Sequence, residues 1–245
     1  MSKTCTVMMV TFNRLELTKI TLKSLYKTAG REFNLVVVDN GSTDGTVEYL
    51  KTIKDMTLIL NDKNKGIAIG RNIALLEADK LKTDYFCTAD NDVKMPDGWL
   101  EECIKILEVN KGYGAIGVNF ETSAYPLVTK NSCTFQDKPA GNLGTAISVF
   151  RKQLHQMIGF FNTEYSEFYG LDDSDFYMRA RVAGFKLGYI EKMGIHLGED
   201  NNEVNEYRKF KTQQHDAFVD LFRKNCGLYA HRKKPIYIPF KDSTP

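Results

Sequence analysis

One run of residues restricts the fold of this chain more than any other feature of its sequence. Asn34-Leu-Val-Val-Val-Asp39 is an unbroken aliphatic stretch, mostly β-branched, between two polar ends. A strand with one face in water alternates apolar and polar residues, so this run predicts a strand that is buried on both faces. Such strands occur almost only in parallel sheets that are covered by helices on both sides. The run therefore predicts an α/β fold.

The first 110 residues repeat this alternation of strand and helix. The apolar pattern predicts further strands at Thr4 to Phe12, Met56 to Leu60 and Tyr85 to Cys87. It predicts helices at Leu15 to Thr28, Thr46 to Ile53, Ile67 to Ala78 and Gly98 to Val109. Short connections between such elements imply right-handed crossovers and a mainly parallel, Rossmann-like sheet flanked by helices.

Beyond Gly112 the alternation weakens, which predicts a smaller second part of the same domain. Strands are predicted at Tyr113 to Val118, Gly141 to Phe150 and Lys186 to Ile190, and a loop or small hairpin at Glu121 to Pro139. Helices are predicted at Arg151 to Met157, Asp172 to Ala183 and Glu203 to Lys224, before an extended tail at Pro235 to Phe240. Gly184 stands where a left-handed residue commonly ends a helix.

The composition is that of a globular protein in water, with 42% hydrophobic and 26% charged residues. The net charge of +2 does not favour nucleic acid as a partner, and the basic run His231-Arg232-Lys233-Lys234 is either solvated or meets an anionic surface. Five scattered cysteines without a close Cys-x-x-Cys pair argue against a disulfide framework. The sequence has no signal-peptide pattern and no transmembrane-length apolar run, so a cytoplasmic location is expected.

Polar and acidic clusters lie where predicted strands end. Asp90-Asn91-Asp92 follows one strand, Thr11 with Asn13-Arg14 ends another, Asp39 to Asp44 ends a third, and Asp172 to Asp175 opens a helix. The carboxyl ends of parallel strands share the sheet edge at which open α/β folds bind ligands. Carboxylates gathered there would repel one another unless a metal ion or a cationic ligand were present.

The two carboxylates of Asp90-Asn91-Asp92 are hard oxygen ligands of the kind that suits Mg²⁺ or Mn²⁺, and such an ion neutralises a diphosphate. The alternative is that the tripeptide is a turn that caps the next helix. No Gly-x-Gly-x-x-Gly follows the first strand and no Walker-type Gly-Lys-Ser/Thr is present, so dinucleotide and P-loop sites are less favoured. A nucleoside diphosphate bound through a divalent ion fits the clusters better.

Five segments follow one another in a fixed order within residues 4 to 198. They are Val10-Thr-Phe-Asn-Arg14, Val38-Asp-Asn-Gly-Ser-Thr-Asp44, Asn64-Lys-Gly-Ile-Ala-Ile-Gly-Arg-Asn72, Ala89-Asp-Asn-Asp92 and Gly170-Leu-Asp-Asp-Ser-Asp-Phe176. In this order and spacing the chain resembles the family 2 glycosyltransferases with the GT-A fold. The resemblance implies a nucleotide-sugar-binding half at residues 1–110, an acceptor and catalytic half at 111–200, and a C-terminal helix with a basic tail at 201–245.

The resemblance implies a role for each matching residue on the donor side. Thr11, in the loop with Asn13 and Arg14, is expected to contact uridine. Asp39 is expected to accept a hydrogen bond from the uracil ring.

Three further segments complete the implied donor site. Arg71, in the segment that begins at Gly66, is expected to lie against the nucleobase and the phosphates. Asp90, with Asn91 beside it, is expected to reach the ribose or the sugar, and Asp92 to bind Mn²⁺ or Mg²⁺.

Asp172 and Asp173 match the family's Glu-Asp pair ahead of a helix, in which the second carboxylate is the general base. Here the pair is Asp-Asp, which leaves open which of the two is the base, and both could instead cap the helix and favour its dipole. His196 lies where GT-A enzymes often supply a further metal ligand, although a lone histidine can equally be structural.

The combined expectation is a metal-dependent, inverting glycosyltransferase that uses a nucleotide sugar, with UDP sugars favoured. The Gln-x-x-Arg-Trp signature of processive synthases is absent, so single transfer is expected, to a glycan, lipid-linked or other hydroxyl acceptor. A catalytically silent nucleotide-sugar binding module is the main alternative. A sugar-phosphate nucleotidyltransferase is less favoured, because its glycine-rich N-terminal phosphate loop is missing.

Overall fold

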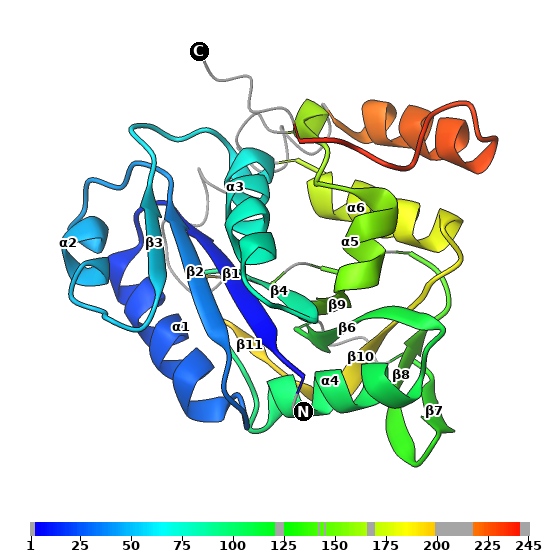
Figure 1. The fold of residues 1–245 in the computed structure, drawn as a ribbon, viewed down its shortest axis with the longest axis horizontal. Coiled ribbons are helices and arrows are strands. Elements are labelled where there is room, and N and C mark those ends of the chain that lie inside the picture. The colour runs from blue at the N-terminus through cyan, green and yellow to red at the C-terminus, as the bar shows by residue number, and fades with distance from the viewer. Residues whose placement is uncertain are drawn as a thin grey trace.

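The computed structural model of the chain describes residues 3–120, 125–141, 143–144, 146–165, 170–198 and 218–240. Within these residues the main sheet has nine strands in the order β3-β2-β1-β4-β9-β6-β10-β8-β7 (Figure 1). Their bounds are β1 (Cys5–Thr11), β2 (Asn34–Asp39), β3 (Thr57–Leu60), β4 (Tyr85–Ala89), β6 (Tyr113–Asn119), β7 (Leu127–Lys130), β8 (Cys133–Lys138), β9 (Ile147–Arg151) and β10 (Lys186–Met193).

The directions of the strands confirm a mainly parallel sheet. The pairs β3-β2, β2-β1, β1-β4 and β6-β10 are parallel. Strand β9 lies between β4 and β6 and is antiparallel to both. The hairpin β7-β8 extends the far edge of the sheet. The small hairpin predicted within Glu121 to Pro139 is therefore confirmed where the chain is described.

Strand β2 is buried on both of its faces, as its aliphatic run predicts. Leu35 and Val37 pack into the core cluster on one face, and Val36 and Val38 into the cluster on the other. The first face is covered by α1 (Leu15–Thr28) and α4 (Trp99–Val109), the second by α3 (Ile67–Lys80), α5 (Lys152–Ile158) and α6 (Asp172–Val182) (Figure 1). Because helices cover both faces of the sheet, polar side chains gather at the ends of the strands.

Several predicted bounds need correction. Helix α2 (Thr46–Leu50) is shorter than predicted, and strand β9 begins only at Ile147 because residues 143–146 are not in a strand where they are described. Two short strands for which the sequence carried no prediction, β5 (Val93–Lys94) and β11 (Ile195–His196), form a small antiparallel sheet. This small sheet places His196 opposite Val93, directly beyond Asp92.

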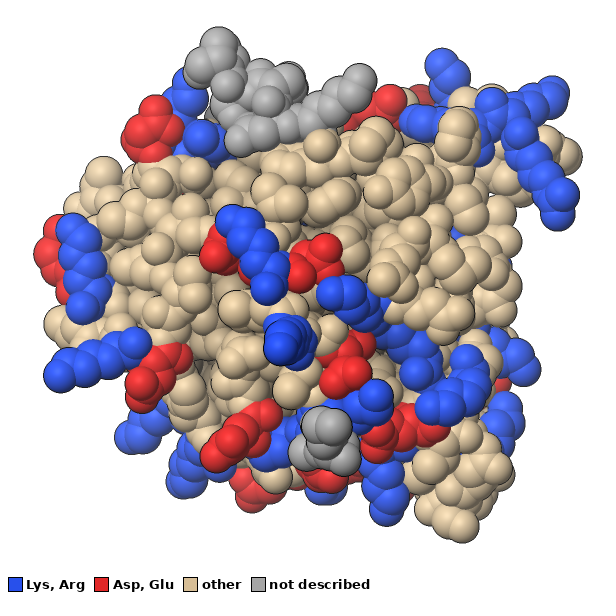
Figure 2. All heavy atoms as spheres, in the orientation of Figure 1, with Lys and Arg blue, Asp and Glu red and all other residues tan. Residues whose placement is uncertain are grey.

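The C-terminal part includes a helix over residues 218–230, which continues beyond the predicted end at Lys224. The remainder of the predicted helix, from Glu203, lies outside the described residues. Figure 2 shows Lys and Arg side chains gathered where Figure 1 draws the end of this helix. Lys234 of the basic run is held by Glu164 at 2.9 Å, whereas Arg232 and Lys233 are exposed. None of the described helices has the length and apolarity that crossing a membrane requires.

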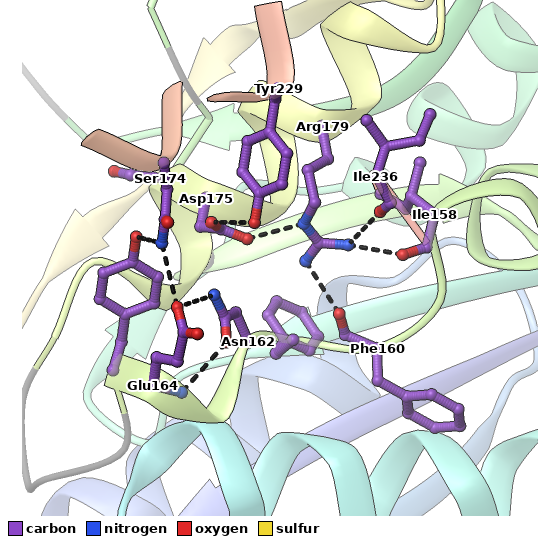
Figure 3. A network of polar contacts seen from close by, with 12 residues as sticks. Ile158, Phe160, Asn162, Glu164, Ser174, Asp175, Arg179, Tyr229 and Ile236 are labelled. Carbon is purple, nitrogen blue, oxygen red and sulfur yellow. Dashed lines mark hydrogen bonds and ion pairs between the residues drawn. The ribbon is translucent and has the colours of Figure 1, made fainter. Parts of the chain in front are cut away.

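A buried polar cluster fastens this C-terminal part to α6 (Figure 3). Arg179 donates from Nε to Asp175 at 2.6 Å, and its other nitrogens donate to the carbonyls of Ile158, Phe160 and Ile236. Tyr229 completes the cluster by donating to the other oxygen of Asp175 at 3.0 Å. Asp175, Arg179 and Tyr229 are fully buried. We call this set the α6 clamp.

Candidate functional site

The predicted site residues at the ends of β1, β2 and β4 lie at one edge of the sheet. Thr11 and Asp39 are direct register partners in the parallel pair β1-β2. Met9 pairs with Ala89, so Asp90 to Asp92 leave β4 beside the end of β1. The three strand ends therefore converge, as the alternation of strands and helices predicts.

Asp39 organises the loop that follows β2. Its carboxylate accepts hydrogen bonds from the backbone N–H groups of Gly41 and Ser42 and from the Ser42 hydroxyl, at 3.0, 2.8 and 2.6 Å. Ser42 Oγ also accepts from the N–H of Asn13, and Asn13 Oδ1 accepts from Thr43 N–H. The buried carboxylate thus fixes the two loops against each other.

Asn91 supports the site from inside. Its Nδ2 donates to the hydroxyls of Thr11 and Thr18, each at 3.0 Å. Thr21 Oγ1 accepts from Val93 N–H, so α1 holds the whole turn that follows β4. The side chains of Thr11 and Asn91 are therefore engaged with each other and with α1.

Asp92 faces an arginine and a histidine. Arg14 Nη1 lies 2.6 Å from Asp92 Oδ2, and His196 Nε2 lies 3.6 Å from Oδ1. Asn13 and Arg14 have left-handed φ angles of 57° and 63°, which turn Arg14 back over the strand ends. A Cβ on Gly198 would come within 2.8 Å of Asp92 Oδ2, so the glycine leaves room for this carboxylate.

Asp92 and His196 offer one oxygen and one nitrogen donor of the kinds that a divalent ion takes, 3.6 Å apart. His196 Nδ1 is buried without a hydrogen-bond partner. The described residues contain no group of three or more His, Cys, Asp or Glu placed for a metal ion.

Arg71 bridges two more carboxylates. It extends from α3, whose N-cap is Gly66, and donates to Asp172 Oδ2 at 2.6 Å and to Asp90 Oδ1 at 3.2 Å. Burial opposes the charge of Arg71, but the carboxylates of Asp172, Asp90 and Asp173 more than offset this, so its pKa is raised. Its guanidinium also lies over the Phe161 ring.

Asp172 and Asp173 occupy different environments at the start of α6. Asp172 is buried, and burial raises its pKa although Arg71 opposes the shift. Asp173 is only partly buried by neighbouring side chains, and burial together with the negative charge of Asp172 raises its pKa to about 6. Its carboxylate accepts from Ser174 N–H and forms no ion pair with any described residue.

The structure brings together the residues predicted for the site. It also shows that arginines of the chain itself pair with the carboxylates there. The sequence alone predicts that a metal ion or a cationic ligand relieves the repulsion among these carboxylates. The chain itself supplies two cations, Arg14 on Asp92 and Arg71 between Asp90 and Asp172. These pairs join residues that are 78, 19 and 101 positions apart, so sequence spacing did not reveal them.

Two supporting residues were also missed as members of the site. Thr18 lies beside Thr21, Leu22 and Leu25 on the buried face of α1, and Ser42 lies among the turn formers after β2. A hydroxyl on a buried helix face was the available signal for Thr18, because a buried polar group needs a partner. Ser42 had no comparable signal.

Comparisons with known proteins identify the family and the fold. The profile of a family described as Glycosyl transferase family 2 matches residues 6–161, more than half of the chain. No curated protein matches the chain in sequence.

Solved structures share the fold at low sequence identity. The mannosyltransferase PcManGT from Pyrobaculum calidifontis, in complex with GDP-Man and Mn²⁺, superposes with a TM-score of 0.66 at 19% identity and covers 94% of this chain. S. aureus TarS 1-349 in complex with UDP has a TM-score of 0.60 at 18% identity and covers 78%. TarS 1-349 with UDP-GlcNAc has a TM-score of 0.59 at 17% identity.

The chain spans 68% of that mannosyltransferase and 59% of the UDP-bound TarS chain. The structural likeness thus establishes the fold, and the sequence profile establishes the family. The chain belongs to glycosyl transferase family 2, and it is a GT-A glycosyltransferase whose structural neighbours bind nucleotide sugars.

Proposed function

We propose that the protein transfers a single sugar from a nucleotide sugar, preferably a UDP sugar, to an acceptor hydroxyl with inversion at the anomeric carbon. The observation that carries the proposal is Asp173, a partly exposed carboxyl at the edge where the donor residues converge, with a pKa raised to about 6. Residues 1–110 hold the donor in this proposal, and residues 111–200 supply the base and the acceptor side.

Asp173 is the general base in this proposal. A single displacement brings the acceptor hydroxyl to the face of the sugar opposite the leaving diphosphate, so the configuration inverts. A carboxylate with a pKa of about 6 is ionised at neutral pH and accepts a proton more readily than an ordinary aspartate. Asp172 is the less suitable of the two, because Arg71 occupies its oxygen at 2.6 Å.

Asp92 and His196 are the residues that would hold Mn²⁺ or Mg²⁺. When bound, the ion supplies Lewis-acid stabilisation of the charge on the departing diphosphate. Arg14 and Arg71 add two fixed positive charges at the same edge of the sheet. In this proposal Asp39 accepts a hydrogen bond from the uracil ring.

The first experiment measures donor binding and turnover together. We expect the purified protein to bind UDP in calorimetry when Mn²⁺ is present, and to hydrolyse or transfer at least one member of a UDP-sugar and GDP-sugar panel. Asp173→Asn is expected to retain UDP binding and lose turnover by about 10²–10⁴-fold, the usual contribution of a general base. Asp220→Asn, an exposed change outside the site, is the matched control.

The possible outcomes separate the hypotheses. Failure to bind either nucleoside diphosphate in the presence of Mn²⁺ would sink the donor proposal. Binding without turnover of any donor in the panel would identify a silent binding module. Full turnover by Asp173→Asn would exclude Asp173 as the base while leaving the donor site intact.

A further inference from the structure

A pocket lies on the other side of the small sheet from Asp92. It has a volume of about 480 Å³, within the range of small-molecule sites. Its apolar lining comes from α1, from the segment after β5, from the end of β10 and from the start of β11, namely Ile20, Met95, Pro96, Met193 and Ile195. Ile20, Met193 and Ile195 keep 38%, 47% and 61% of their surfaces exposed, so an apolar face is open to solvent.

Three lysines surround this apolar lining. Lys23 and Lys27 lie one turn apart on α1, and Lys94 is the last residue of β5. All three are exposed, and none forms an ion pair with a described residue. The described lining contains no carboxylate. The pocket therefore joins an apolar interior to three uncompensated positive charges.

We propose that this pocket binds an amphiphile with one long hydrocarbon chain and a phosphate monoester head. The chain would occupy the apolar lining, and the head would lie between the lysines. A phosphate monoester carries between −1.5 and −2 charges at about pH 7, so it matches three lysines better than a carboxylate does. The hollow volume favours an inserted chain over contact with a flat membrane surface.

The pocket is separate from the proposed donor site. Consecutive strand residues point to opposite faces, so Ile195 lines the pocket while its neighbour His196 faces Asp92. Hydrogen bonds from Val93 N–H to Thr21 and from Met95 N–H to Ser24 fix α1 against the strand between the two sites. Binding here does not depend on sugar transfer and is tested without a donor.

Calorimetry with dodecyl phosphate below its micelle concentration tests the proposal. We expect saturable binding of one molecule per chain, which weakens with salt because the lysines carry the head. Inorganic phosphate and dodecyl maltoside are expected to bind far more weakly, because each lacks one half of the ligand. From octyl to dodecyl phosphate the affinity should rise, by up to about fourfold for each added methylene.

Two variants assign the binding to this pocket. Ile20→Glu blocks the apolar lining, and Lys27→Gln removes one charge. Each is expected to weaken dodecyl phosphate binding by at least about tenfold. Leu127→Glu on β7 and Lys51→Gln are the matched exposed controls, and they should bind as the parent does.

Each remaining result counts against the proposal. Equal binding of dodecyl maltoside would show a merely apolar groove, and equal binding of inorganic phosphate a merely basic patch. Binding to anionic vesicles without binding to monomeric dodecyl phosphate would show a membrane-facing surface instead. Unchanged binding by both variants, with circular dichroism showing that they are folded, would place the ligand elsewhere.

Discussion

Two aspartates of helix α6 stand two residues apart and serve opposite purposes. Asp175 is fully buried, and both of its oxygens are taken, one by Arg179 and the other by Tyr229. Asp173 is partly exposed, has no ion pair among the described residues, and has a pKa raised to about 6. A carboxylate paired with a buried cation contributes to the stability of the fold, because breaking the pair is costly. A carboxylate beside a like charge instead has a raised pKa and accepts a proton more readily.

The largest expected effect comes from breaking the clamp. Asp175→Asn leaves the Arg179 guanidinium buried without its counter-charge, and it should reduce the free energy of unfolding by about 3–5 kcal/mol. Urea denaturation measures this loss. Asp220→Asn is the control, because its pair with Arg223 is also within one helix but is exposed, and it should change stability by less than about 1 kcal/mol. Equal losses of stability in Asp175→Asn and Asp220→Asn would contradict the expected difference between a buried and an exposed ion pair.

Asp173→Asn is expected to change stability in the opposite direction. Because the folded state holds the Asp173 proton more tightly than the unfolded chain does, the parent loses stability as the pH rises from about 4 through about 6. The asparagine does not ionise, so the variant should be about 2 kcal/mol more stable at pH 7.5 and equal to the parent near pH 4. Denaturation at both pH values checks this, and a variant that is less stable at pH 7.5 would refute it.

Tyr229→Phe removes one hydrogen bond from the clamp and leaves its ion pair. The expected loss is about 1 kcal/mol, because Arg179 continues to neutralise Asp175. Turnover per folded molecule should be unchanged, since the tyrosine does not reach Asp173. Tyr237→Phe, a half-exposed residue of the same C-terminal segment, is the control and should be neutral. A loss of turnover without a loss of stability would show that the two carboxylates are coupled.

The smallest expected effect is a shift in the pH profile. kcat/KM should rise with pH through a value near 6 as Asp173 ionises. In Asp172→Asn the midpoint should move to lower pH, because the like charge disappears and Arg71 is left to favour the Asp173 carboxylate. Initial rates across pH 5 to 8, at saturating metal, measure the midpoint. A midpoint that stays in place would assign the ionisation to another group.

The sequence predicted the sheet well where local pattern determines structure. The aliphatic run of β2 and the periodicity of α1 and α3 follow from burial on fixed faces, and these elements lie close to their predicted bounds. The position of β9 between β4 and β6 could not be predicted, because strand order depends on contacts between distant residues. Strands β5 and β11 are two residues each, too short to show any period.

The candidate site shows the same division. Asp39, Asp90 and Asp92 were placed by the rule that strand ends converge, which needs only the order of the elements. The cations opposite them were not, since Arg71 reaches Asp172 across 101 positions and Arg14 reaches Asp92 through a left-handed turn. Charge pairing across a fold is a property of the packed structure rather than of a motif.

The α6 clamp also limits when α6 can complete its folding during synthesis of the protein. A ribosome delivers β1 to α4 first, and domains and their parts fold as they emerge. Arg179 finds its last carbonyl partner at Ile236, and Asp175 its hydroxyl partner at Tyr229. The helix that carries the proposed base therefore cannot bury its charges fully until the segment with Tyr229 and Ile236 has left the ribosome. The strands and helices from β1 to α4 can form early, but α6 is secured only after that later segment has been made.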